Sequence, residues 1–297
     1  MAEDSSGIAL WRSEAAGELA SLQAADGGWP YVVGQTSATE PTALAMLALA
    51  AAGVGGYRRS EAADWLAARQ RGDGMFTASP LVEEGGWLTA LAGVAMLREG
   101  RTDLASASAI ALLDEATYTF YSPLTANVYN YDTQLRGWPW TPGDFSLVEP
   151  TALAMIFLKQ AGYRDHARVR EAADMLRNRA VAGGGWNYGE PRVWNADLFP
   201  IVSNTGVVLA ALADEQEGTT AAGLTWLQSQ RGAITSLPSL GWATIGLNVL
   251  GSLDDAWRAD AIELWRSSPS ERRGPMETAL CLLGLSEAGV HPLGVTE

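Results

Sequence analysis

One stretch of the chain combines aromatic side chains with carboxylic acids, the residue types that acid–base chemistry in an apolar site requires. Residues 118–145 hold eight of the 25 aromatic residues, and Asp132 and Asp144 lie among them. Apolar surroundings raise the pKa of a carboxyl group, so that it keeps a proton and can act as a general acid. We therefore take Asp132, which follows Tyr131, and Asp144 as candidate catalytic acids. The competing interpretation is that each carboxylate caps a solvated turn.

The aromatic residues around these acids predict a binding surface for an apolar or cationic group. A long connection in a compact domain is often functional, and a cation over a ring face gains about 0.5–2 kcal/mol. Alternatively, the loop only packs on itself and covers one end of the fold. The candidate binding residues in this loop and in the aromatic group that follows it are Tyr129, Tyr131, Trp138, Trp140, Trp186, Tyr188 and Trp194.

Residue counts exclude several classes of protein. With 34 acidic and 20 basic residues the net charge is −14, which disfavours nucleic acid as a partner. Two histidines and a single cysteine, Cys281, are too few for a Cys/His-rich structural zinc site or a disulfide framework. Lys159 is the only lysine, and no phosphate-binding loop precedes it. We expect neither a metal nor another cofactor.

The hydropathy pattern predicts a protein without a membrane span. The first residues lack the basic and apolar regions of a signal peptide, so we expect a cytoplasmic protein. The longest uncharged stretch, residues 232–253, contains Pro238 and four glycines, a composition that is atypical of a transmembrane helix.

An internal repeat organises the chain. Residues 28–46 and 137–155 align without a gap at an offset of 109 residues, with 12 of 19 positions identical. Weaker copies fill the rest, and each contains an outer segment with one charged face, a glycine-rich turn with an aromatic residue, and an apolar segment. We expect the apolar segments at residues 40–52, 86–98, 149–161, 203–214, 240–250 and 275–288.

Both kinds of segment are predicted to be helices. Residues 57–71 place Ala62, Trp65 and Leu66 on one face and charges elsewhere, whereas residues 42–52 are apolar all round and must be buried on every side. Six helices of each kind fit an all-α (α/α)6 toroid, formed by residues 1–297 as one domain. An open solenoid, the alternative, would leave the apolar helices half uncovered.

Two carboxylates are duplicated with the repeat. Glu40 and Glu149 each begin a Glu-Pro-Thr sequence at the expected start of an inner helix, where the helix dipole favours a carboxylate by about 0.3–1 kcal/mol. Because these helix starts surround one mouth of a toroid, contact with a ligand remains open for both glutamates.

The glycine-rich turn resembles a known repeat. Gln23-Ala24-Ala25-Asp26-Gly27-Gly28-Trp29 is similar to the Q-x₃-G-x-W repeat of the terpenoid cyclase and protein prenyltransferase superfamily, also called prenyltransferase/squalene oxidase repeats. The resemblance implies a single squalene-hopene-cyclase-like toroid with an axial funnel for an isoprenoid. It also implies that Trp29, Trp138 and Trp186 pack between helices.

The activities of that superfamily have motifs of their own, and this chain lacks them. The nearest approach to D-x-D-D is Ser252-Leu253-Asp254-Asp255, in which serine replaces the first aspartate. The D-D-x-x-D motif is absent because Arg258 occupies its last position, and neither zinc-ligand spacing nor Gly-Cys-Gly-Glu-Gln occurs.

Three functions therefore remain open. The first is a terpenoid cyclase- or prenyltransferase-like protein that acts on, or holds, an isoprenoid or polyprenyl substrate in a central apolar funnel, with an Asp as general acid. The second is a non-catalytic toroid that binds a lipid, another apolar small molecule or a protein partner. The third is a carbohydrate-active (α/α)6 enzyme with an aromatic platform and a carboxylate pair.

Overall fold

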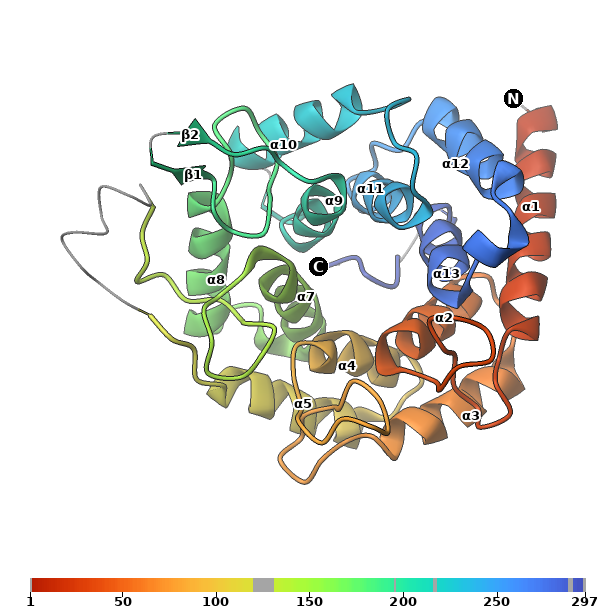
Figure 1. Cartoon of the computed structure of the whole chain (residues 1–297), viewed down its shortest axis with the longest axis horizontal. Coiled ribbons are helices and arrows are strands. Elements are labelled where there is room, and N and C mark those ends of the chain that lie inside the picture. The colour runs from red at the N-terminus through yellow and green to blue at the C-terminus, as the bar shows by residue number, and fades with distance from the viewer. Residues whose placement is uncertain (1, 120–130, 195, 216–217, 288–290, 296–297) are drawn as a thin grey trace.

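The computed structural model describes residues 2–119, 131–194, 196–215, 218–287 and 291–295. Twelve α-helices in these residues form two concentric rings (Figure 1). The inner ring consists of α2 (Thr39–Ala51), α4 (Leu88–Arg98), α7 (Val148–Leu158), α9 (Val202–Ala211), α11 (Leu237–Val249) and α13 (Pro275–Gly284). The outer ring consists of α1 (Ala2–Ser21), α3 (Gly56–Ala67), α5 (Thr102–Asp114), α8 (Ala167–Asn178), α10 (Gly218–Ser229) and α12 (Asp255–Ser267).

The ring is closed, which confirms the predicted all-α toroid and excludes the open solenoid. Each inner helix contacts the next, and α13 contacts α2. The first outer helix, α1, lies against α13, where the Arg12 side chain donates a hydrogen bond to the Leu285 carbonyl across 2.7 Å. The remaining elements are short: the π-helix η1 (Lys159–Tyr163), the 3₁₀ turn η2 (Ser270–Arg272), and a hairpin of β1 (Arg192–Val193) and β2 (Ala196–Asp197) that the sequence pattern did not predict.

The alternation of half-solvated and fully buried helices follows from composition. In α8 the apolar residues Ala172, Ala173 and Leu176 are buried, while Arg170 and Asp174 face solvent. Helix α2 is apolar on all sides and is buried from Thr39 to Leu49 except at Glu40. A helix of the second kind is stable only when other helices surround it, and the outer ring provides that cover.

A tryptophan and a threonine tie each well-formed turn to its inner helix. The backbone N–H of Trp138 donates to the Thr151 hydroxyl at 2.8 Å, and its indole N–H donates to the carbonyl of Leu112 at 2.9 Å. Trp29 and Trp186 repeat both contacts in their own turns. These rings therefore pack between an outer and an inner helix.

Side chains fill the middle of the ring, which corrects the expectation of an open central funnel. The side chains in the middle of each inner helix are at most 2% exposed. Neither bulk water nor an internal void of water size therefore touches this part of the helices. Helices α9 and α11 approach so closely that a Cβ atom on Gly206 would lie 2.2 Å from the Trp242 carbonyl oxygen. The buried middle stretches of the six inner helices are residues 43–49, 90–96, 152–158, 207–211, 243–247 and 279–283.

The C-terminal segment, residues 291–295, closes one end of the ring and lies inside it in Figure 1. Arg98, the last residue of α4, and Gln160, in η1, donate hydrogen bonds to the Pro292 carbonyl at 3.2 and 2.9 Å. The buried His291 side chain accepts from the Leu293 N–H at Nδ1, so its Nε2 carries the proton that bonds the Leu283 carbonyl at 3.1 Å. Access to the inner helices is thus left at the opposite end.

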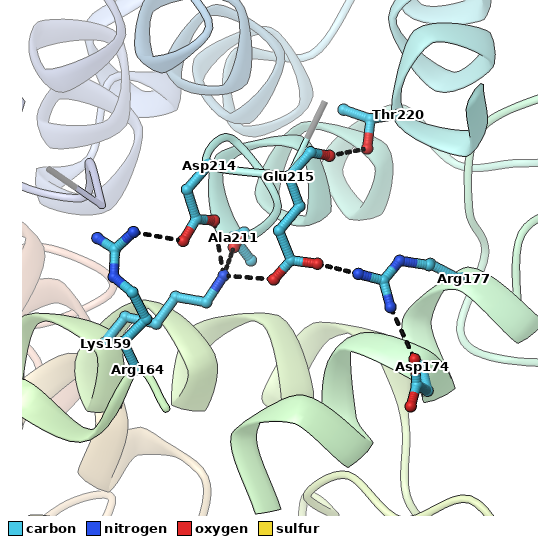
Figure 2. Close-up of polar contacts among 8 residues, drawn as sticks. All are labelled: Lys159, Arg164, Asp174, Arg177, Ala211, Asp214, Glu215 and Thr220. Carbon is cyan, nitrogen blue, oxygen red and sulfur yellow. Dashed lines mark hydrogen bonds and ion pairs between the residues drawn. The ribbon is translucent and has the colours of Figure 1, made fainter. Parts of the chain in front are cut away.

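A buried ion-pair network joins the third and fourth repeats (Figure 2). The Lys159 ammonium group, whose side chain is 1% exposed, contacts Asp214 at 2.7 Å, Glu215 at 3.1 Å and the Ala211 carbonyl at 3.0 Å. Arg164 pairs with Asp214, and Arg177 pairs with Glu215. The only lysine is therefore fully paired, and the network as a whole holds the end of α9 against η1 and α8.

Candidate functional site

The open end of the ring carries a group of carboxyl and aromatic side chains that we call the mouth. It comprises six residues in the loops and first turns at the start of the inner helices: Tyr31, Glu40, Trp140, Glu149, Tyr188 and Glu277. The glutamates belong to α2, α7 and α13. Their helices start at this end because each follows a loop from an outer helix, and this shared topology gathers residues that are far apart in the sequence.

Two of the glutamates are each paired with an aromatic hydrogen-bond donor. The Tyr31 hydroxyl donates to Glu40 Oε2 at 2.5 Å. The Trp140 indole N–H lies near the Glu149 carboxyl group and favours its charged form. Tyr31 and Trp140 occupy equivalent positions in the two copies of the repeat, nine residues before their glutamates. The duplication has therefore preserved an aromatic donor and a carboxyl acceptor as a pair.

The mouth raises the pKa of all three carboxyl groups. Burial is the main cause for Glu149, whose pKa rises to about 7, and the charge of Glu40 adds to it. Burial also raises the pKa of Glu40, with Glu277 as a second cause, although the Tyr31 hydrogen bond opposes the shift. The pKa of Glu277 is raised by burial. Near neutral pH, Glu149 is thus divided between a proton donor and a proton acceptor.

Aromatic rings cover one side of these acids. Trp140 and Tyr188 meet edge to face with ring centroids 5.6 Å apart, and they are 37% and 51% exposed. Tyr188 is fixed because its carbonyl accepts the N–H of Val148, which begins α7, at 3.1 Å. An apolar ligand lying against these two rings would reach the Glu149 carboxyl group.

A cavity that we call the loop pocket lies beside α8 and has a volume of about 430 Å³. Its aromatic lining consists of Tyr118, Tyr131 and Phe145, and its charged lining consists of Asp144, Arg179 and Glu190. Tyr118 and Phe145 meet edge to face with centroids 4.9 Å apart, and the Arg179 guanidinium lies 3.6 Å from the centroid of the Tyr131 ring.

The structure does not place the predicted catalytic acids in the mouth. Asp132 is exposed, and its Oδ1 accepts the Gln134 N–H at 2.8 Å, as expected of an aspartate that closes a turn. Asp144 is also exposed and lines the loop pocket, where its Oδ1 accepts the Phe145 N–H at 2.8 Å. Water around both carboxylates removes the apolar environment on which their selection as acids depended.

The predicted binding residues divide into several groups. Tyr131 lines the loop pocket, whereas Trp140, Tyr188, Glu40 and Glu149 form the mouth. Trp138 and Trp186 belong to the core instead, since their rings are at most 1% exposed and their indole N–H groups bond helix carbonyls. Trp194 is 76% exposed at the tip of the β1–β2 hairpin and belongs to neither the mouth nor the lining of the loop pocket. Tyr129 lies outside the described residues.

Three residues of these sites were not singled out from the sequence. Tyr31 had a signal, because it aligns with Trp140 across the repeat. Glu277 follows a proline in the first turn of an inner helix, as Glu40 and Glu149 precede one. Arg179 had no signal, because it is one arginine among several near the end of an outer helix.

The sequence that approaches a cyclase motif has a structural role. Asp254, in the sequence that approaches D-x-D-D, caps α12 by accepting the Trp257 N–H at 2.9 Å. No group of three or more potential metal ligands is found in the part of the chain that the structure describes. Among the described helices, none combines the length and the apolar composition that a bilayer span requires.

Comparison with known proteins identifies the fold. No protein-family model and no curated protein matches the chain. A solved structure of a variant of type II terpene cyclase MstE from Scytonema, with its substrate geranylgeranyl dihydroxybenzoate, aligns with 97% of this chain and 99% of its own, at 14% identity and a TM-score of 0.66. The chain has a terpenoid cyclase-like toroid fold.

Other proteins have the same toroid. An α-amylase from Clostridium perfringens aligns at 12% identity and a TM-score of 0.67 over 94% of this chain and 97% of its own. A protein from Actinoplanes aligns at 16% identity and a TM-score of 0.61 over 94% and 98%. Because one scaffold is shared by a cyclase and an amylase, activity has to be argued from the residues of the site.

Proposed function

We propose that the protein is a terpenoid cyclase-like enzyme that binds an oxygen-bearing isoprenoid at the mouth and isomerises it by proton transfer from Glu149. The observation that carries this proposal is the pair of aromatic-held carboxyl groups, Tyr31 with Glu40 and Trp140 with Glu149, of which Glu149 has a pKa of about 7. A carboxyl group with this pKa is available as an acid near neutral pH.

The chemistry of Glu149 favours oxygen as the atom that is protonated. An acid with a pKa near 7 is too weak to protonate a bare alkene efficiently, but it suits an epoxide oxygen whose C–O bond breaks as the proton arrives. The electrons of a neighbouring double bond then form the new C–C bond. A carboxylate of the mouth, Glu40 or Glu149, removes a proton from the resulting cation, so the overall reaction is an isomerisation without a co-reactant.

The surroundings of Glu149 support the cationic stage. Trp140 and Tyr188 offer ring faces, and a cation over a desolvated ring gains about 2 kcal/mol. Glu40 and Glu277 add negative charge. The filled ring centre limits the substrate to a short prenyl chain that lies across the mouth. The MstE structures, one with a geranylgeranyl substrate and one with the product merosterolic acid A, support an isoprenoid as the ligand class.

The test is turnover of farnesol that carries a terminal epoxide. The wild type should convert it to a product of equal mass, and Glu149→Gln should lower the rate by about 10²–10⁴-fold, the usual contribution of a general acid. Glu263→Gln, an exposed glutamate of α12, and Asp132→Asn are matched controls that should retain the rate. Binding without turnover in the wild type would indicate a non-catalytic isoprenoid carrier, and neither binding nor turnover would refute the proposal.

A further inference from the structure

We propose that the open end of the ring is the docking surface of a basic partner protein, which presents lysine or arginine side chains around an apolar centre. Of the 16 large apolar residues that are exposed in the described part of the chain, 12 lie in the four loops that precede α2, α4, α7 and α9. At the opposite end of the ring the described exposed residues of this kind are Val54 and Tyr57. Exposed apolar side chains that gather on one face mark an interaction site.

The four loops adjoin one another, so their exposed apolar side chains form one surface, which we call the apolar crescent. The Thr39 N–H, at the start of α2, donates to the carbonyl of Ala78, in the loop before α4, at 2.9 Å. Gly86 ends that loop so close to the next one that a Cβ atom on it would lie 3.0 Å from the Trp140 carbonyl oxygen. Trp140 in turn meets Tyr188, in the loop before α9. Because Trp140 and Tyr188 also belong to the mouth, a partner on the crescent would cover the mouth.

The tips of these loops are apolar, although turns usually carry glycine, proline, asparagine, aspartate or serine. The Gln35 N–H closes a turn on the Val32 carbonyl at 3.0 Å, and Val33 within this turn is 62% exposed. Leu81, at the tip of the next loop, is 81% exposed. Trp194 has a φ of 51°, in the left-handed region that favours glycine or asparagine. These side chains add little packing to the fold, so a contact outside the chain accounts for their apolar character better than folding does.

The charge of the same loops selects a basic partner. Four exposed carboxylates form no ion pair within the described residues: Glu83, Glu84, Asp144 and Glu190. The exposed arginines of the described loops are already paired, Arg71 with Asp73 at 3.0 Å and Arg136 with Glu171 at 2.9 Å. Lysine or arginine side chains on a partner would therefore complement the unpaired carboxylates, while its apolar residues cover the loop tips.

The same charge disfavours two other occupants of the apolar crescent. Anionic lipids attract basic segments, whereas the crescent would press its unpaired carboxylates against a membrane surface of this kind. A symmetric contact with a second copy of the chain would bring the carboxylates of one copy toward those of the other, which costs free energy. Tryptophan, tyrosine and phenylalanine, which the crescent contains, are enriched at interfaces between proteins.

Binding of three synthetic peptides of equal length tests the assignment, with fluorescence anisotropy as the measurement. The first peptide has a leucine face and a lysine face, the second has glutamate in place of lysine, and the third has serine in place of leucine. We expect the leucine–lysine peptide to bind about tenfold more tightly, or better, than either of the others, because the crescent offers both apolar contact and negative charge.

Variants of the loop tips locate the bound peptide. Leu81→Ser combined with Phe199→Ser should weaken binding of the leucine–lysine peptide about tenfold. Glu83→Gln combined with Glu84→Gln should weaken it about threefold and make it less sensitive to salt. The matched control is Leu10→Ser combined with Tyr57→Ser, two exposed apolar residues outside the crescent, which should bind within about twofold of the wild type.

Other outcomes overturn the assignment. These are equal binding of the three peptides, or binding that the change of Leu81 and Phe199 leaves intact. Adsorption to phosphatidylcholine vesicles that this change abolishes would assign the crescent to a lipid surface, and dimerisation that it abolishes would assign it to a second copy; either result refutes a basic protein partner. Peptide binding is measured without an isoprenoid and does not depend on the proposed reaction at the mouth, so the two proposals fail separately.

Discussion

The Tyr31 hydroxyl donates a hydrogen bond to the Glu40 carboxyl group across 2.5 Å at the open end of the ring. A similar arrangement recurs 109 residues later, where the Trp140 indole lies near the Glu149 carboxyl group and opposes the rise of its pKa. Each donor stabilises the charged form of a carboxyl group that burial would otherwise protonate.

Removal of the Tyr31 phenol hydroxyl should therefore lower the free energy of unfolding mainly at high pH. In Tyr31→Phe the ionised Glu40 loses its donor, and we expect the free energy of unfolding to fall by about 1–3 kcal/mol at pH 8. The fall should be smaller at pH 5, because burial raises the pKa of Glu40 and so favours its protonated form in acid. Urea unfolding at both pH values measures the difference. Tyr57→Phe, at an exposed tyrosine that contacts Glu61, is the matched control. A loss that is equal at both pH values would contradict the assignment.

The raised pKa of Glu149 predicts a stability that declines with rising pH. The folded protein keeps a proton that the unfolded chain releases between pH 4.5 and about 7, so the free energy of unfolding falls across this window. The decline from Glu149 should amount to about 1–3 kcal/mol after allowance for solvent at the mouth. Glu149→Gln should reduce it and raise the thermal midpoint at pH 8. Glu115, with a pKa also near 7, has the same sign and preserves part of the slope.

The hydrogen bond between Trp138 and Thr151 should be needed for the repeat to fold tightly. Thr151→Val keeps the shape of the side chain but leaves the buried Trp138 N–H without its acceptor at 2.8 Å, so we expect a loss of about 1–3 kcal/mol. Denaturant unfolding measures it. Thr225→Val, at an exposed position of α10, should change stability by less than about 0.5 kcal/mol, and an equal loss in both variants would argue against a special role of the turn.

Substitution of Lys159 should destabilise the fold more than substitution of most residues outside the mouth. Lys159→Met removes the only cation that contacts both Asp214 and Glu215 in Figure 2 and leaves those carboxylates only arginine partners, so we expect a loss of about 3–5 kcal/mol. The surface pair Arg231–Asp260 is the comparison, and Arg231→Met should cost at most about 1 kcal/mol. Similar losses in the two variants would mean that the network is solvated.

The C-terminal segment should loosen in acid. Burial lowers the pKa of His291 to about 4 from an ordinary value of 6.5, so the unfolded segment binds a proton that the folded one excludes. Its stability should fall as the pH drops from about 6.5 to 4. Hydrogen exchange at the Leu293 amide, corrected for the intrinsic rate, measures this, and His291→Gln should remove the pH dependence. Constant protection of that amide in the wild type would contradict the prediction.

The sequence by itself determined the architecture. The duplicated segment at residues 28–46 and 137–155, together with helices that are either apolar all round or apolar on one face, is compatible only with a closed double ring once every apolar face has to be buried. The repeat also marked Glu40 and Glu149, because the same carboxylate at the same helix start is visible without coordinates. Hydrophobic periodicity is a local property, so it can be recognised from the order of the residues alone.

Only the tertiary structure decided which carboxyl groups are shielded from water. Asp132 lies between aromatic residues in the sequence yet is exposed, whereas burial and the charge of the more distant Glu40 raise the pKa of Glu149 against the opposing effect of Trp140. The filling of the ring centre likewise depends on how six helices meet, as at Gly206 and Trp242. Burial and charge interactions are sums over neighbours in space, and the order of residues along the chain does not specify those neighbours.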